Sequence, residues 1–274
     1  MPWTETTRLQ YRRAGLRFAS DTTDAEWMLL KGLMPEPAGV GRPRTTDLRG
    51  IVDAILYVLG TGCQWRALPK DFPPRSTVQG YFYRWRDDGT WHCINRQLVR
   101  WVRITIGRNP VPTAGIIDSQ SAKTTESGGP RGFDMAKKVK GRKRHIVTDT
   151  EGWLLTALVQ TANVQDNHGA VPLLRTTRQR FPTLRHLFAD RVYRGPKLLD
   201  AIADVGKWTI DIVTRIQSVG AFKPEPRRWV VERTFAWLGR NRRLAKDFEA
   251  TVASAEAWIM VASVQLLTRR LARA

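Results

Sequence analysis

The 274-residue chain has few of the side chains that build disulfide frameworks or zinc sites. It contains only two cysteines, Cys63 and Cys93, which are too few for a disulfide scaffold or a cysteine-type zinc site. Its four histidines are scattered and form no HxH or HxxxH pair. We therefore expect most of the histidines to be ordinary surface or core residues.

The sequence also lacks a secretory signal and any apolar run long enough to span a bilayer. We therefore expect a reduced, cytoplasmic protein associated with the nucleoid. Acidic residues are scarce. The chain has 25 Asp and Glu residues and 45 Lys and Arg residues, which gives a formal net charge of +20. Such a charge predicts a polyanionic partner. Nucleic acid is the first candidate, because no lysine-rich amphipathic helix with a clean apolar face indicates a membrane surface.

The first hundred or so residues have the periodicity of several short helices, which fits a globular chain with 42% hydrophobic residues. Apolar residues recur at helical spacing in about 23–34, 47–59, 76–86 and 90–106. Short helices accompanied by arginines and aromatic residues are compatible with a helix-turn-helix DNA-binding region. A plain helical bundle that packs on a second domain is the alternative.

The pattern changes from helical to strand-like around residues 107–112, where we place a domain boundary. The prediction is a helical N-terminal DNA-binding region over 1–110 and a mixed α/β (α+β) domain over 111–274. In the second region we expect a strand at 116–117, a hairpin over 144–161, a helix over 167–180, a strand over 184–189, a helix from 195, a strand over 208–213 and two long helices from about 226.

Three acids stand out in this second region. Asp118 directly follows the β-branched pair Ile116 and Ile117, and Asp190 ends the predicted strand 184–189. A carboxylate at the exit of a buried strand is costly to desolvate unless it meets a cation or a hydrogen-bond donor. The alternative for Asp118 is a turn-forming residue. Other acids, including Asp149 and Asp166, are assigned to turns, helix caps or the surface.

The third acid, Glu232, lies on a basic helical stretch. Small residues, Ala236 and Gly239, share its face, which leaves room for a bulky anion to reach the carboxylate. An ion pair with Arg228 or Arg233 is the structural alternative. Three carboxylates suit Mg²⁺, a hard ion that prefers oxygen ligands and binds substrate phosphates. Two such ions can activate a nucleophilic oxygen and stabilise a leaving oxygen in phosphoryl transfer.

Several motifs then resemble those of a known family. Ile117-Asp-Ser-Gln-Ser121, the basic stretch 137–145, Leu187-Phe-Ala-Asp190 and residues 229–244 closely resemble bacterial insertion-sequence DDE transposases of the IS-five type. Cys63-Gln-Trp-Arg-Ala-Leu-Pro69 is similar to the N-terminal region of the same family. The resemblance covers roughly residues 24 to 250. It implies a ribonuclease H-like catalytic domain.

The resemblance also implies a site and an activity. Asp118, Asp190 and Glu232 would be the catalytic, metal-binding triad, with Mg²⁺ as cofactor and Mn²⁺ as a substitute. The protein would bind the terminal inverted repeats of its element in double-stranded DNA, cleave phosphodiester bonds at the ends and join the 3′-OH groups to target DNA. Synapsis of two ends implies a homodimer or higher oligomer. An inactive, repurposed transposase acting as a DNA-binding regulator and a simple metal-dependent nuclease are the competing hypotheses.

Ten basic residues would hold backbone phosphates in this hypothesis. They are Lys137, Lys138, Lys140, Arg142, Lys143, Arg144, Arg228, Arg240, Arg242 and Arg243. The alternative for the run 137–144 is a solvated, flexible loop.

Overall fold

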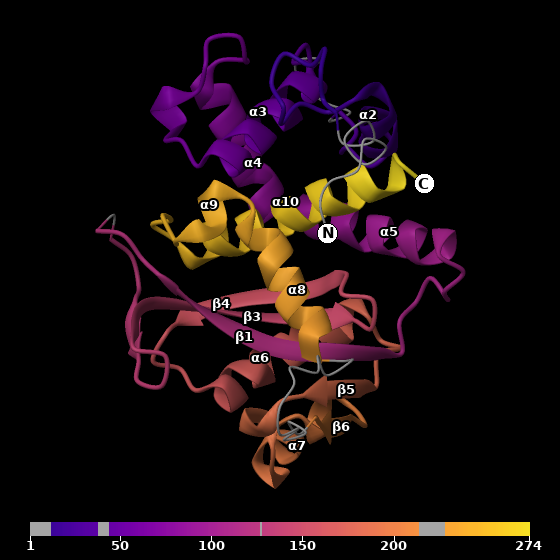
Figure 1. Cartoon of the computed structure of the whole chain (residues 1–274), viewed down its shortest axis with the longest axis vertical. Coiled ribbons are helices and arrows are strands. Elements are labelled where there is room, and N and C mark those ends of the chain that lie inside the picture. Colours follow the sequence, from indigo (N-terminus) through magenta and orange to yellow (C-terminus); the bar gives the residue numbers. More distant parts are fainter. Residues whose placement is uncertain (1–11, 38–43, 127, 214–227) are drawn as a thin grey trace, which may run out of the picture.

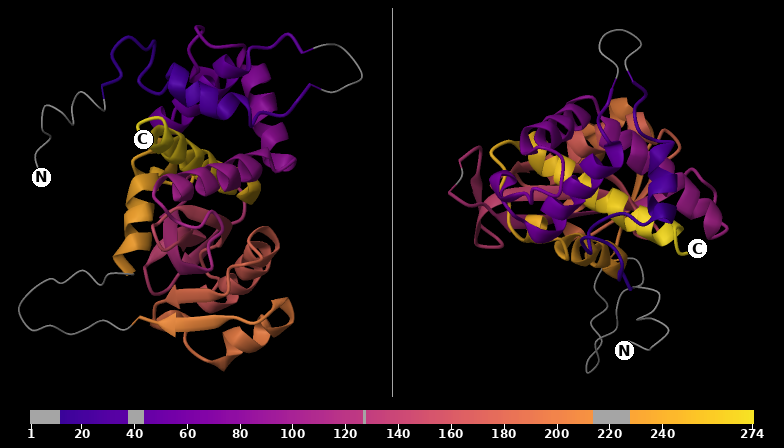
Figure 2. Two further views of the ribbon diagram at one scale, coloured as in Figure 1. Left: turned by 90° about the vertical axis from the view of Figure 1, so that its right-hand side faces the viewer. Right: turned by 90° about the horizontal axis from the view of Figure 1, so that it is seen from above.

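The structure is a computed structural model that describes residues 12–37, 44–126, 128–213 and 228–274. Residues 1–11, which begin the basic stretch over residues 1–20, lie outside these ranges. Its described part is a mixed sheet covered by helices from both ends of the chain (Figures 1 and 2). None of the described helices is long and apolar enough to cross a membrane.

The sheet combines an antiparallel meander with two parallel strands. Strands β1, β3 and β4 pair antiparallel, β5 runs parallel to β1, β6 runs parallel to β5, and the short β2 pairs with β3. The bounds are β1 Ala114–Lys123, β2 Gly132–Asp134, β3 Val139–Asp149, β4 Leu154–Thr161, β5 His186–Ala189 and β6 Thr209–Ile212. The predicted hairpin and both later strands are therefore confirmed.

Strand β1 is longer than the sequence indicates. It pairs with β3 from Gly115 opposite Asp149 to Lys123 opposite Gly141. The expectation that Asp118 lies just past a short strand is wrong, because this pairing continues the strand beyond it. Asp118 is therefore held on a rigid element.

The helices follow the predicted pattern closely. Thr23 and Glu26 form a reciprocal capping box at the start of α2, and the Asp47 side chain caps α3. The bounds are α2 Asp24–Lys31, α3 Leu48–Thr61, α4 Arg75–Asp87, α5 Thr90–Thr105, α6 Asp166–Arg180, α7 Pro196–Ala201, α8 Arg228–Gly239, α9 Arg242–Ala245 and α10 Val252–Leu271.

The C-terminal helix α10 joins the N-terminal helices to the sheet. It packs against α2, α3, α4 and α5 on one side and against β4 on the other (Figure 1). Trp258 of α10 stacks on Phe82 of α4 with ring centroids 4.3 Å apart. Buried Asn95 of α5 donates to the Leu154 carbonyl of β4 and accepts from Ser263 of α10. The regions on either side of residue 110 thus share one hydrophobic core.

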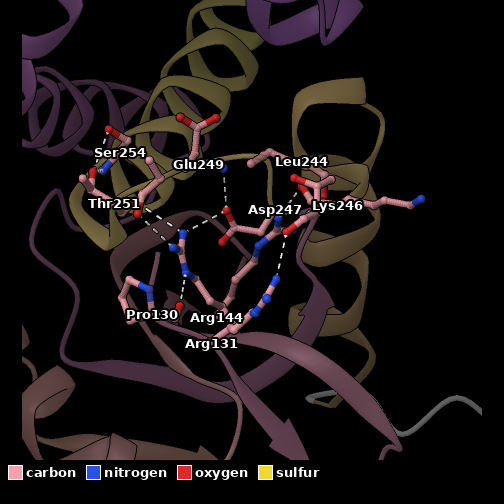
Figure 3. A network of polar contacts seen from close by, with 12 residues as sticks. Pro130, Arg131, Arg144, Leu244, Lys246, Asp247, Glu249, Thr251 and Ser254 are labelled. Atoms are coloured by element: carbon pink, nitrogen blue, oxygen red, sulfur yellow. Dashed lines mark hydrogen bonds and ion pairs between the residues drawn. The ribbon is translucent and has the colours of Figure 1, made fainter. Parts of the chain in front are cut away.

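Two buried arginines of β3, Arg142 and Arg144, bond to the chain around the connection between α9 and α10. Figure 3 shows Arg144 beside Leu244, Lys246 and Asp247. The Arg142 side chain is fully buried, lies 3.1 Å from Asp247 and donates to the Pro130 carbonyl at 2.8 Å. Arg144 donates to the carbonyls of Leu244 and Lys246. Three of these four partners, all except Pro130, therefore belong to the C-terminal part of the chain.

We predict that Arg142→Met lowers the free energy of unfolding by about 3–5 kcal/mol, because it leaves the Asp247 carboxylate buried without its cation. Urea denaturation measures the change. The matched control is Arg131→Met in the preceding loop, whose long contact with Glu126 should contribute no more than about 1 kcal/mol. Equal losses in the two variants would contradict a structural role for Arg142.

Candidate active site

Asp118 and Asp190 are brought together by the parallel pairing of β1 and β5. Ile116 lies opposite Phe188, and the same register continued by two residues reaches the two aspartates. Both line one small cavity, whose wall includes Val231 of α8. The Asp190 side chain also accepts a hydrogen bond from the backbone N–H of Val192 at 3.0 Å. The sheet thus places two predicted site residues side by side.

The buried Tyr193 lies close to this pair of aspartates. Burial raises the pKa of its hydroxyl well above the usual value, and the charges of Asp118, Asp166 and Asp190 raise it further. Three carboxylates therefore act on one buried hydroxyl. This marks the middle of β1 and the adjacent end of β5 as a concentration of negative charge within a strongly basic protein.

Glu232 lies on α8, which runs across β1 (Figure 1). It lines an open groove of about 580 Å³ together with Ala236 and Gly239 of α8, residues 119–121 of β1 and Lys137. A side chain built on Gly239 would meet nothing within 4 Å, so this part of the groove is open. Because Ser119 follows Asp118 and Glu232 follows Val231, the groove adjoins the cavity of the two aspartates.

These carboxylates suit a hard divalent cation in their chemistry, since Mg²⁺ takes oxygen ligands and is commonly held by one or two carboxylates. Asp118 and Asp190 are the pair that the fold brings to one cavity, and Glu232 lies in the next one. Among the described residues, no three His, Cys, Asp or Glu side chains are close enough together to form a metal-binding group. The two aspartates are therefore the members of the predicted triad that share one cavity.

The ten predicted phosphate-binding residues divide into two groups. Lys137, Lys138, Lys140, Arg240 and Arg242 are exposed, whereas Arg142, Lys143, Arg144 and Arg243 are buried; the side chain of Arg228 lies outside the described part.

The expected phosphate role is corrected for the four buried residues, because each is bonded inside the chain. Arg142 pairs with Asp247, Lys143 with Asp134 and Asp166, and Arg243 with Glu249, while Arg144 binds backbone carbonyls. The alternative interpretation of the basic run as a solvated, flexible loop is also wrong for residues 139–144, because they form the first part of β3.

Two acids behind the site were not predicted as site residues from the sequence. Asp166, which we assigned to a helix cap, accepts a hydrogen bond from the Ser119 hydroxyl at 2.8 Å and lies 2.9 Å from the Lys143 ammonium. The Asp134 carboxylate lies 3.3 Å from the same ammonium. No local pattern identifies these acids, because their partners come from other strands.

Comparison with known proteins agrees with this geometry. Residues 109–267 match the family described as "Transposase DDE domain", and residues 22–95 match "Putative transposase of IS4/5 family". The chain is 34% identical over 148 residues to the "Putative transposase for insertion sequence element IS402" of Burkholderia cepacia, which covers 49% of this chain and 64% of that protein. It is 30% identical over 66 residues to the "Uncharacterized protein y4sN" of Sinorhizobium fredii, over 24% of this chain and 53% of that protein.

The matched segments thus span less than two thirds of the length of each of these relatives. No solved structure matches the chain. A mixed sheet of this topology, with one aspartate on a strand, a second directly after the adjacent strand and a glutamate on a later helix, fits the ribonuclease H-like domain of the DDE class. The chain belongs to the DDE transposase family of insertion sequences.

His145 is a buried histidine behind the site. It lies on β3 opposite Ser119, is fully buried, and neither ring nitrogen has a hydrogen-bond partner among the described residues. Burial lowers its pKa to about 4; the charge of Asp166 opposes this change, and those of Lys143 and Lys137 add to it. His145 is therefore neutral in the folded protein at neutral pH.

This burial predicts a pH dependence of stability. The folded pKa of His145 lies below the ordinary value of 6.5, so the unfolded chain binds more protons between about pH 4 and 6.5, and stability falls as the pH drops through this window. His145→Asn should reduce the slope of unfolding free energy against pH there by up to about 1.4 kcal/mol per pH unit. Denaturation curves across the window measure it, and an unchanged slope would contradict a neutral His145.

Proposed function

We propose that the protein is a DNA transposase that binds the terminal inverted repeats of its own insertion sequence. It cleaves phosphodiester bonds at the element ends and joins the resulting 3′-OH groups to target DNA. The observation that carries this proposal is the pair Asp118 and Asp190 on adjacent parallel strands, in a chain that belongs to a transposase family. The named transposase among its relatives, that of element IS402, supports the same function.

In this proposal Asp118 and Asp190 hold the divalent cation and Glu232 completes the site. Mg²⁺ is the cofactor and Mn²⁺ substitutes for it, since both are hard ions that accept carboxylate oxygens. The metal, when bound, activates the attacking oxygen and stabilises the leaving oxygen. Glu232 reaches the site from the groove, where Ala236 and Gly239 leave room for the DNA backbone.

The rest of the DNA is held by exposed positive charge. Lys137, Lys138, Lys140, Arg240 and Arg242 would contact backbone phosphates, as would Arg228 at the start of α8. The helical region over 1–110 would bind the element ends. The chain's net charge of +20 supports a polyanionic partner, although part of its positive charge is used inside the fold. Because two ends are processed together, the active form is a homodimer or a higher oligomer.

We predict that Asp118→Asn, Asp190→Asn and Glu232→Gln each abolish cleavage of the element ends while leaving end binding intact. The loss should exceed the roughly 10–100-fold typical of residues that only support a metal ligand. Strand cleavage in Mg²⁺ and Mn²⁺, measured beside a gel-shift assay, tests this. Asp200→Asn, which changes an exposed acid on α7, is the control and should cleave normally.

The inverted repeats in the DNA flanking the gene supply the substrate. Wild-type protein that binds these ends but never cleaves them with either metal would overturn the enzymatic proposal in favour of a regulator. Cleavage without joining of pre-cleaved ends to a target plasmid would instead indicate a nuclease.

A further inference from the structure

A buried lysine bridges two carboxylates beneath the groove. Lys143 of β3 is 5% exposed, and its ammonium lies 2.9 Å from Asp166, 3.3 Å from Asp134 and 2.9 Å from the Val164 carbonyl oxygen. A buried ammonium has three donors, and here three acceptors satisfy them. Lys143 therefore fixes the two carboxylates relative to each other.

Each of these carboxylates holds a part of the groove wall. Asp166 accepts the Ser119 hydroxyl at 2.8 Å, and Asp134 accepts the Ser121 hydroxyl at 2.5 Å. Burial alone would raise the pKa of Asp134, but the hydrogen bonds from Ser121 and the Lys137 backbone, with the charge of Lys143, lower it to about 2. Asp134 is thus ionised at neutral pH.

Asp134 also shapes the turn that carries Lys137. Its carboxylate accepts the backbone N–H groups of Ala136 and Lys137, both at 3.0 Å. The next residue, Lys138, has φ +54°, a left-handed conformation that non-glycine residues seldom adopt and that often marks a functional segment. The turn is therefore held in a strained form by the charges beneath it.

The Lys137 side chain, which follows this turn, lines the groove that Glu232 also lines. Its ammonium donates to the Ser119 carbonyl at 3.0 Å and lies 3.4 Å from the Ser119 hydroxyl oxygen. Of the described residues that line the groove, Lys137 alone carries a positive charge. Glu232 lines the same open groove. Because the Lys137 ammonium makes polar contacts only with Ser119 among the described residues and has three donors, it keeps donor capacity for a phosphate.

We propose that Lys137 binds the backbone phosphate of the DNA strand that lies next to Glu232, and that the buried Lys143, Asp134 and Asp166 cluster positions it there. The inference rests on the proposed function, since it names the contact that holds the strand in the same groove. Lys137 touches the DNA, whereas Asp134 and Lys143 act through it as positioning residues. Lys140, which lies on β3 and does not line this groove, would contact a phosphate elsewhere on the duplex.

The test is a scan of backbone charge. Duplexes carrying the element's terminal repeat, each with one neutral methylphosphonate linkage, are bound to wild type and to Lys137→Gln without Mg²⁺ or Mn²⁺. We expect wild type to lose affinity at one linkage near the cleavage point, and Lys137→Gln to show no further loss at that linkage. The salt slope of Lys137→Gln binding should also fall by about 0.9. Identical linkage profiles in the two proteins would overturn the contact.

Matched variants separate position from charge. Lys137→Arg should keep the linkage-specific loss, while Lys140→Gln should lower overall affinity and leave the loss at the Lys137 linkage unchanged. Asp134→Asn, which removes one charge at constant shape, should weaken the same linkage, and combining it with Lys137→Gln should add nothing at that linkage. Additive effects in a variant that still unfolds cooperatively would overturn the positioning role of Asp134. The linkage scan measures DNA binding alone and tests only the role of Lys137. Failure of the wild-type protein to cleave the ends would refute the proposed function, and it would not change the result of the scan.

Discussion

The buried ion pair of Arg142 and Asp247 is the contact on which the placement of the C-terminal helices depends. The two side chains are almost completely shielded from solvent and join β3 to the segment between α9 and α10. Asp247 also pairs through its backbone with the end of β1, where its N–H donates to Lys123 and its carbonyl accepts from Thr125. A segment that follows α8 is thereby fixed to the strand that carries Asp118, and the helix that carries Glu232 is confined to the face of β1.

The chain comes unusually close to itself around this pair. Gly129 has φ +82°, and a side chain at this position would lie 2.1 Å from the Ala250 carbonyl oxygen and 2.5 Å from the Arg142 guanidinium. Only glycine allows both the left-handed backbone and the close approach. The loop before β2 and the segment before α10 are therefore packed around one guanidinium, which satisfies the carbonyls that both would otherwise bury unpaired.

Much of the fold can be read from local pattern, and the candidate triad from motif resemblance. The capping box of Thr23 and Glu26, the Asp47 cap and the apolar runs of β1 and β5 are local signals, and the structure contains each of them. The structural role of the buried basic residues could not be predicted in this way, because their partners lie in other parts of the fold. Arg142 pairs with an acid 105 positions away, and Lys143 with acids from β2 and α6. A run of cations resembles a solvated loop until the tertiary partners that neutralise it are known.

The central claim is that Asp118 and Asp190 form a divalent-metal site that Glu232 completes. Anomalous diffraction from crystals of the protein soaked in Mn²⁺ tests it most directly. The account predicts a manganese peak within coordinating distance of the Asp118 and Asp190 carboxylates, on the side that faces α8. A protein saturated with Mn²⁺ that places the ion elsewhere, or leaves both aspartates without it, would contradict the account.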